Sequence, residues 1–244
     1  MVLYKMKKNT KSKVLIGSPI TAIKKYKSYC LEEYLNSLDN LSYPDKEFSL
    51  LLNQEGGDQL INEYPHLNIK RMPFRETVEE TCVLARNILR KRAIEERFDY
   101  LMFIEQDIIP LPDLVERLMQ HHKGVCSALY FNEMEPDKYR YGVNTLFFPM
   151  AWNFDPALLE KGEYSEKLFR PEDLIKGKLM QVDVCGLAAV LISRQVLEKI
   201  SFRYIYGSPP IFEEFCFGRD CRSNGIDIFL DSSVVCRHYS ARGL

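Results

Sequence analysis

The sequence predicts an α/β fold in which helices flank a mostly parallel central sheet. Short apolar runs of strand length alternate with segments of helical periodicity through the first half of the chain. The run at 100–104 is continuously apolar, as expected for a central strand covered on both faces. Polar residues follow several of these runs. Such alternation is typical of parallel strands joined by helices, and ligands of such sheets bind at the carboxyl ends of the strands.

The bulk composition limits the class of protein. With 244 residues, 46% of them hydrophobic and 27% charged, the chain is expected to form one α/β domain over 14–244 after a basic tail at 1–13. A net charge of −1 gives no reason to expect nucleic acid as a partner. No apolar run is long enough to cross a bilayer, and no secretory signal is visible. Seven cysteines without a C-x-x-C pair predict free thiols in a cytoplasmic setting.

The basic tail has two interpretations. Its lysines are expected to be solvated, which is the favoured interpretation, or to make peripheral contact with an anionic membrane surface where a lipid-linked acceptor lies. These lysines are Lys5, Lys7, Lys8, Lys11 and Lys13.

The first half, 14–131, is expected to carry most of the sheet. Strands are predicted at 14–17, 48–52, 67–70, 100–104 and 124–131, and helices at 26–38, at 77–96 and from 112 onward. Thr77 and Glu80 have the spacing of a capping box. One face of the 77–96 helix is expected to be apolar and buried; it comprises Val78, Cys82, Ala85, Leu89 and Ala93.

The second half, 132–244, is less regular and is expected to shape the acceptor side. Hairpins and loops are predicted up to 155, then one buried strand at 182–193, helices at 194–200 and 210–224, and final strands at 226–230 and 234–236. Several aromatic residues here either stack on a sugar acceptor or form a local core, and the sequence favours neither. They are Trp152, Tyr139, Tyr141, Phe147 and Phe148.

Two acidic residues follow the strand predicted at 100–104. Glu105 and Asp107 stand one residue apart where the chain leaves the sheet, with Gln106 between them expected to be exposed. Carboxylates of this kind suit Mg2+ or Mn2+, which takes one or two of them together with substrate phosphates. The alternative is that Asp107 only caps the next turn.

Four further residues have a chemical and a structural interpretation. Arg86, on the long helix, either clamps a diphosphate or is an ordinary surface arginine. Glu213 and Glu214 either supply a general base or interact only with the helix dipole. His238 is a metal ligand or a structural histidine. A zinc site of Cys216, Cys221, Cys236 and His238 is disfavoured by its spacing, and His121 and His122 are expected to cap a helix.

In combination these segments resemble a known family. The stretch Ala85–Asn87, the strand with Glu105–Asp107, the segment 182–192 and the ending Glu213–Glu214 … Phe217 … Gly225 … Asp231 … His238 resemble the ordered motifs of GT-A glycosyltransferases, family-2-like. The resemblance extends from about residue 14 to 238. It implies a single Rossmann-like GT-A domain whose first half binds a nucleotide-sugar.

The resemblance also implies roles. Asp107 and His238 would bind the metal, and Glu105 would assist or contact the donor. Arg86 would hold the diphosphate, Ser18 and Asn53 would line the nucleoside pocket, and Gly186 would let the backbone pass close to the sugar. Glu214 stands at the position of the family's aspartate base, beside Glu213. Glutamate replaces aspartate at both 105 and 214, which keeps the charge at each position but, at Glu105, adds a methylene that moves the carboxylate outward.

The implied activity is transfer of a sugar from a nucleoside-diphosphate sugar to a hydroxyl acceptor, with inversion favoured. The acceptor would be a glycan, a lipid-linked molecule or a protein, and Mn2+ or Mg2+ would be the cofactor. One rival is a non-catalytic nucleotide- or glycan-binding protein derived from a transferase. A less favoured rival is a sugar nucleotidyltransferase, which would need a Gly-rich basic loop that Gly17–Ile20 does not provide.

Overall fold

The computed structural model describes residues 12–21, 28–53, 58–134 and 146–239. Lysines 5, 7, 8 and 11 of the predicted tail, and the aromatic residues Tyr139 and Tyr141, lie outside the described residues.

The centre of the molecule is an eight-stranded sheet with the order β11-β14-β6-β13-β4-β1-β2-β3. All of its strands except β11 and β13 point in the same direction. This confirms the predicted α/β fold with a mostly parallel sheet. The strands are β1 (Val14–Ile20), β2 (Lys46–Leu52), β3 (Ile69–Arg71), β4 (Tyr100–Ile104), β6 (Val125–Leu129), β11 (Leu179–Val182), β13 (Ala189–Ser193) and β14 (Ile228–Val235).

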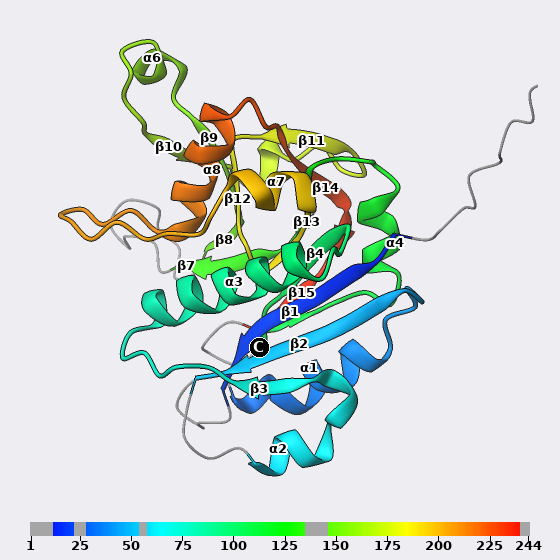
Figure 1. Cartoon of the computed structure of the whole chain (residues 1–244). Coiled ribbons are helices and arrows are strands. Elements are labelled where there is room, and N and C mark those ends of the chain that lie inside the picture. The colour runs from blue at the N-terminus through cyan, green and yellow to red at the C-terminus, as the bar shows by residue number, and fades with distance from the viewer. Residues whose placement is uncertain (1–11, 22–27, 54–57, 135–145, 240–244) are drawn as a thin grey trace, which may run out of the picture.

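Helices cover both faces of this sheet (Figure 1). On one face α1 (Leu31–Asp39) and α4 (Leu114–Met119) bury Leu35 and Leu118 against one half of the core. On the other face α3 (Val78–Glu95), α7 (Arg194–Lys199) and α8 (Glu213–Ser223) bury Leu89 and Phe217. Smaller elements complete this part of the chain: α2 (Asp58–Glu63), α6 (Pro156–Leu159), and 3-10 turns at Ser28–Cys30, Pro65–Leu67 and Pro171–Asp173.

Smaller sheets flank the main one. The strands β9 (Ala151–Phe154), β10 (Glu166–Leu168) and β12 (Val184–Cys185) form one small sheet. The strands β7 (Phe131–Met134) and β8 (Leu146–Pro149) pair with each other, as do β5 (Ile108–Ile109) and β15 (Arg237–His238). The irregular second half is therefore largely built from short antiparallel pairs.

The first strand is longer than predicted. It continues past Gly17 to Ile20, because β2 stays paired with it as far as the Ile20–Leu52 register. Pairing with β4 on the other side stops at Gly17. A proline is tolerated where one side of a strand lacks a ladder partner, which explains why Pro19 does not end this strand.

The prediction of one buried strand over 182–193 was wrong. The segment forms the end of β11, then β12, then β13, with β12 paired to β9 in another sheet. All three pieces contain apolar residues that are buried from both sides, so hydrophobicity alone did not reveal the breaks. The two predicted final strands are in turn one strand, β14, with an irregular register between Asp231 and Val235.

The long helix α3 projects beyond the sheet at its start. Thr77 caps it by accepting a hydrogen bond from the Glu80 amide at 3.2 Å, as the sequence predicted. Ala85, Leu89 and Ala93 are buried, but Val78 is 64% exposed, contrary to the predicted face. The amphipathic pattern therefore marks only the part of the helix that lies over β1 and β4.

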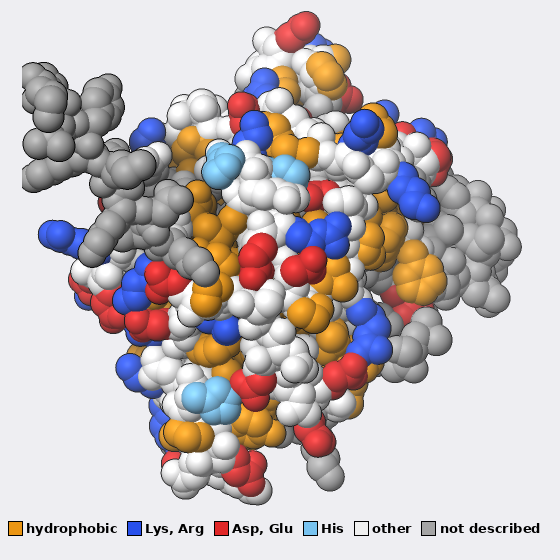
Figure 2. Space-filling model, turned by 90° about the vertical axis from the view of Figure 1, so that its right-hand side faces the viewer, with side chains coloured by type: hydrophobic (Ala, Val, Ile, Leu, Met, Phe, Trp, Pro, Cys, Tyr) orange, Lys and Arg blue, Asp and Glu red, His pale blue; other side chains and the backbone are white. Residues whose placement is uncertain are grey.

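The described surface is of mixed character. Figure 2 shows acidic and basic side chains interspersed with apolar ones on the face where α4 lies, in keeping with the formal net charge of −1. Within the described ranges, no helix has the length and hydropathy needed to span a membrane. All seven cysteines carry free thiols.

Gly218 is where α8 approaches β12 most closely. A Cβ atom there would lie 2.6 Å from Val184 Cγ2 and 2.8 Å from the Asp183 carbonyl oxygen. We therefore expect Gly218→Ala to lower the free energy of unfolding by about 1–3 kcal/mol through overpacking, as measured by urea denaturation. Ser223→Ala, at an exposed position of the same helix, should change it by less than about 0.5 kcal/mol. Equal stability of the two variants would contradict this packing.

Candidate active site

The acidic pair lies at the carboxyl end of β4, as predicted. β4 ends at Ile104, and the Glu105 amide donates to the Ala188 carbonyl at 2.8 Å. The chain then turns tightly, since the Ile108 amide donates back to the Glu105 carbonyl at 2.9 Å. This turn directs Asp107 into the interior, where it is only 1% exposed.

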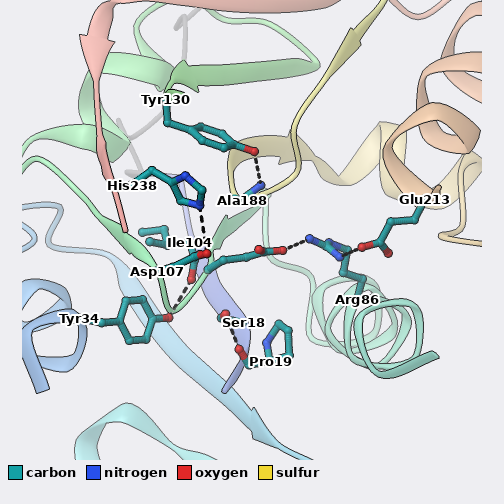
Figure 3. A network of polar contacts seen from close by, with 11 residues as sticks. Ser18, Pro19, Tyr34, Arg86, Ile104, Asp107, Tyr130, Ala188, Glu213 and His238 are labelled. Atoms are coloured by element: carbon teal, nitrogen blue, oxygen red, sulfur yellow. Dashed lines mark hydrogen bonds and ion pairs between the residues drawn. The ribbon is translucent and has the colours of Figure 1, made fainter. Parts of the chain in front are cut away.

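The pairing of β5 with β15 brings His238 to Asp107. His238 lies opposite Ile108 in this antiparallel pair, and the Tyr239 amide donates to the Asp107 carbonyl at 2.8 Å. As a result, His238 Nε2 lies 3.0 Å from Asp107 Oδ2 (Figure 3). The two residues predicted to share a cation are thus neighbours, although 131 positions separate them in the sequence.

The other ring nitrogen of His238 determines what Nε2 offers. Nδ1 lies 2.9 Å from the Phe131 carbonyl oxygen, which can only accept, so Nδ1 carries a proton. In the neutral ring Nε2 then presents a lone pair to the Asp107 carboxylate. Two electron-pair donors face each other in this state, and either a second proton or a cation between them removes the conflict. The donor set therefore fits a divalent cation.

Tyr130 is a site residue that the sequence did not reveal. Its ring packs edge-on against His238, with centroids 5.5 Å apart, and its hydroxyl accepts from the Ala188 amide at 3.2 Å. A Cβ atom at Gly186 would lie 1.9 Å from that hydroxyl, so glycine is needed there for close approach to Tyr130. A single tyrosine in an apolar run carries no sequence signal for this role.

Ser18 and Tyr34 lie beneath the acidic turn. The Tyr34 hydroxyl donates to the Ile104 carbonyl at 2.8 Å, which fixes the end of β4 (Figure 3). Ser18 is fully buried and donates to the Pro19 carbonyl at 2.8 Å. Its contact with a nucleoside stays a prediction.

Asn53 follows β2 and connects it to the start of α3. Its side chain accepts from the Arg75 amide at 2.8 Å and donates to the Arg75 carbonyl at 3.0 Å and to Thr81 Oγ1 at 2.9 Å. Asn53 therefore holds the loop before α3 in place. A role in the nucleoside pocket stays a prediction for this residue too.

Arg86 is buried, and the alternative of an ordinary surface arginine was wrong. Its side chain is 2% exposed and lies between two carboxylates: one terminal nitrogen donates to Glu105 and the other to Glu213 (Figure 3). The two acids and Arg86 come from the end of β4, the start of α8 and the middle of α3. The arginine thus joins three elements at the edge of the candidate site.

Burial changes the acid strength of the glutamate pair. It raises the pKa of Glu213 to about 7, although the Arg86 guanidinium acts to lower that pKa, and the carboxylates of Glu105 and Glu214 add to the rise. Burial also raises the pKa of Glu214. A raised pKa makes a carboxylate a stronger base once it is ionised.

Glu105 faces Arg86, whereas Asp107 faces His238. Within the residues that the structure describes, no three His, Cys, Asp or Glu side chains are grouped so as to hold a metal ion. Two of the three predicted metal ligands are therefore together, and direct ligation by Glu105 stays a prediction. The disfavoured zinc set is not grouped either; the Cys216 thiol instead lies 3.7 Å from the Ile211 carbonyl oxygen.

One minor expectation was wrong. Gln106 is 5% exposed rather than exposed, because its amide group bonds to both the amide and the carbonyl of Thr21, at 2.7 and 3.0 Å. His121 and His122 lie at the C-terminal end of α4, as expected, where their amides donate to the Leu118 and Met119 carbonyls at 3.4 and 3.0 Å. The His121 ring also interacts with the Asp231 carboxylate at 2.7 Å. Of the aromatic acceptor candidates, Trp152 is 9% exposed and packs on Phe215 at 5.1 Å between centroids, which supports its interpretation as core.

Comparison with known proteins identifies the fold. No protein-family model and no curated protein sequence matches the chain. The structure is similar to the mannosyltransferase PcManGT from Pyrobaculum calidifontis in complex with GDP-Man and Mn2+, with a TM-score of 0.57, 12% identity, and coverage of 94% of this chain and 57% of that one. It is similar to GalNAc-T7 with UDP, GalNAc and Mn2+, with a TM-score of 0.63, 13% identity, and coverage of 95% and 44%.

A third similar structure is A197 from STIV, at a TM-score of 0.47 and 15% identity, covering 93% of this chain and 85% of that one. The chain spans about half the length of the two transferases, as the coverages of 57% and 44% state. Its fold is GT-A-like, as the sequence motifs predicted.

The buried arginine leads to a stability prediction. Arg86→Met keeps the length of the side chain but leaves the Glu105 and Glu213 carboxylates without their shared cation. We expect a loss of about 3–5 kcal/mol in the free energy of unfolding, measured by chemical denaturation. Adding Glu213→Gln should restore part of that loss, since one uncompensated charge is removed.

The control for this prediction is Lys91→Ala, which removes an exposed charge from the same helix and should cost less than about 0.5 kcal/mol. A loss in Arg86→Met no larger than in Lys91→Ala would refute the role of the ion pairs.

Proposed function

We propose that this protein is a divalent-metal-dependent glycosyltransferase. It moves a sugar from a nucleoside-diphosphate sugar to a hydroxyl acceptor, with inversion at the anomeric carbon. The observation that carries the proposal is the buried pair of Asp107 and His238 at the carboxyl end of β4, where an α/β sheet binds its ligand. The GT-A-like fold supports the same conclusion, because both similar transferases were solved with a nucleotide or nucleotide-sugar and Mn2+.

Asp107 and His238 would hold Mn2+ or Mg2+ through a carboxylate oxygen and Nε2. The bound cation supplies charge neutralisation of the leaving diphosphate. The Phe131 carbonyl orients the His238 ring, and the Tyr239 amide holds the backbone of Asp107. Glu105 would contact the donor or complete the metal ligands after a change of rotamer. Ser18 and Asn53 would border the nucleoside, and Gly186 would let the backbone pass close to the sugar.

Arg86 has a different role in this proposal from a direct diphosphate clamp. Both of its terminal nitrogens are paired with Glu105 and Glu213. Arg86 would therefore act on the donor chiefly by orienting these two carboxylates. This arrangement places the guanidinium next to the site without exposing it to solvent, with its charge offset by the two carboxylates.

Glu214 is the proposed base, with Glu213 as the alternative. Both stand in the first turn of α8 and are shielded from water, and burial raises the pKa of each. Glu213 is committed to Arg86, whereas Glu214 is the one of the two without that ion pair. Glu214 would take the proton of the acceptor hydroxyl as its oxygen attacks the anomeric carbon and the bond to the diphosphate breaks.

Two rivals lead to other outcomes in the same experiments. A non-catalytic binding protein would bind nucleotide with Mn2+ but release no diphosphate from any donor. A sugar nucleotidyltransferase would form a nucleotide-sugar from a nucleoside triphosphate and a sugar phosphate. The segment Gly17–Ile20 that would have to bind the triphosphate lies within β1, and offers no glycine-rich loop.

The metal site gives the first functional prediction. Incubation with a panel of nucleotide-sugars and Mn2+ should release nucleoside diphosphate, and EDTA should abolish the release. Asp107→Ala and His238→Ala should each lower it by at least about a hundredfold, because the leaving group loses its charge stabilisation. His66→Ala, at a half-exposed histidine that pairs with Asp39, is the matched control and should retain full activity. The proposal fails if no donor is turned over and Asp107→Ala binds nucleotide as well as the wild type.

The glutamate pair gives the second functional prediction. Glu214→Gln should lower kcat for transfer by about 10²–10⁴-fold while leaving Mn2+-dependent nucleotide binding within twofold of the wild type. Binding is measured by calorimetry, and the anomeric configuration of the wild-type product by NMR should be inverted. A larger loss in Glu213→Gln, with Glu214→Gln nearly active, would transfer the role of base to Glu213.

A further inference from the structure

An exposed aromatic segment lies directly before the glutamate pair. Residues 204–212 connect α7 to α8 and project from the body as the orange loop in Figure 1. Ile205, Tyr206 and Phe212 are 38%, 66% and 44% exposed. Large apolar side chains that gather in one exposed patch are typical of a binding surface, whereas singly exposed ones are not. We call residues 204–212 the aromatic hairpin.

The hairpin is held firmly at its base. Ile205 and Ile211 exchange both backbone hydrogen bonds, at 3.1 and 3.0 Å. Arg203 donates twice to the Asp220 carboxylate, at 3.0 and 2.7 Å, which ties the segment to α8. The Asn87 amide group bonds to both the amide and the carbonyl of Phe202, at 3.1 and 2.7 Å, which ties it to α3. Its aromatic side chains are therefore positioned before any ligand arrives.

Three rings of the hairpin form a continuous series that ends next to the glutamate pair. Tyr206 packs edge-on against Tyr204 at 4.7 Å between centroids, and Tyr204 packs edge-on against Phe212 at 5.7 Å. Phe212 immediately precedes Glu213. The Tyr206 side chain also lies beside Thr77 and Glu80 at the start of α3, so the series spans the outer edge of the site.

The composition of the hairpin indicates the chemistry of its ligand. The segment Tyr-Ile-Tyr-Gly-Ser-Pro-Pro-Ile-Phe has no charged residue, and the arginine before it is paired with Asp220. An anionic lipid surface would require free lysines or arginines. Tyrosine combines a flat apolar face with a hydroxyl group, which suits a ligand with apolar C–H faces and many hydroxyls.

From this geometry we infer that the aromatic hairpin is the acceptor subsite and that it binds an uncharged saccharide by stacking of sugar rings on Tyr206 and Phe212. The inference rests on the proposed transferase function and specifies its acceptor class. A sugar held there presents its hydroxyl toward the first turn of α8, where Glu213 and Glu214 stand. The side chain of Phe147, which is 46% exposed, is the alternative position for the same ligand.

The test measures saccharide binding without catalysis. Saturation-transfer NMR with the full chain and a panel of methyl hexopyranosides and disaccharides should detect binding by the wild type. Tyr206→Ala and Phe212→Ala should each weaken it about fivefold to tenfold through loss of a stacking face. Tyr206→Phe, which keeps the ring, and Ile175→Ala, which alters an exposed apolar residue of the segment before β11, should bind within twofold of the wild type. Circular dichroism melting checks that each variant is folded.

Several outcomes would overturn the inference: no binding of any saccharide by the wild type, equal binding by folded Tyr206→Ala, or loss of binding only in Phe147→Ala. Binding to phosphatidylcholine and phosphatidylglycerol vesicles that requires Tyr206, without saccharide binding, would also overturn it in favour of a lipid contact. The proposed function is tested separately. Mn2+-dependent diphosphate release with no saccharide binding refutes only the inference, and saccharide binding with no release from any donor refutes only the function.

Discussion

The bridge made by Arg86 between Glu105 and Glu213 is the interaction on which the candidate site depends. It connects the end of the central strand β4, through α3, to the first turn of α8. Removing one guanidinium from water is costly, and that cost is recovered only because two carboxylates accept from it at once. The bridge therefore fixes the distance between the half of the site that would face the donor and the half that would face the acceptor.

A group of one cation and two anions has consequences for its neighbours. The excess negative charge lies in a buried region, where charges interact more strongly than in water. Burial raises the pKa of Glu213 against the opposing effect of Arg86, and the nearby Glu105 and Glu214 carboxylates add to that rise. Arrangements that shift the protonation of buried acids are common where proteins carry out chemistry. In this molecule the contacts that join β4, α3 and α8 also influence the protonation of Glu213.

Much of the first half could be predicted from the sequence, because its signals are local. β4 begins and ends where its apolar run does, and Thr77 caps α3 as its spacing indicates. The proximity of His238 to Asp107 could be predicted only from the order of the family motifs, since no periodicity connects residues so far apart in the sequence. The role of Tyr130 and the pairing of Arg86 with Glu213 were not predictable, because both arise from contacts between residues far apart in the sequence that leave no pattern along the chain. The breaks at 183 and 186–188 were missed because every piece of that segment is buried.

The pairing of β5 with β15 has a consequence for the order of folding. The loop that must close to bring His238 to Asp107 spans 131 positions, so its closure costs more chain entropy than forming the nearer contacts among β1, β2 and β4, and we expect it to follow them. An intermediate with these early strands in place would already bury much of the sheet, but it would present Asp107 without His238 beside it. A divalent ion that needs both Asp107 and His238 would then distinguish the completed molecule from its nearly folded precursors. Affinity for such an ion would report on the last step of folding as much as on chemistry.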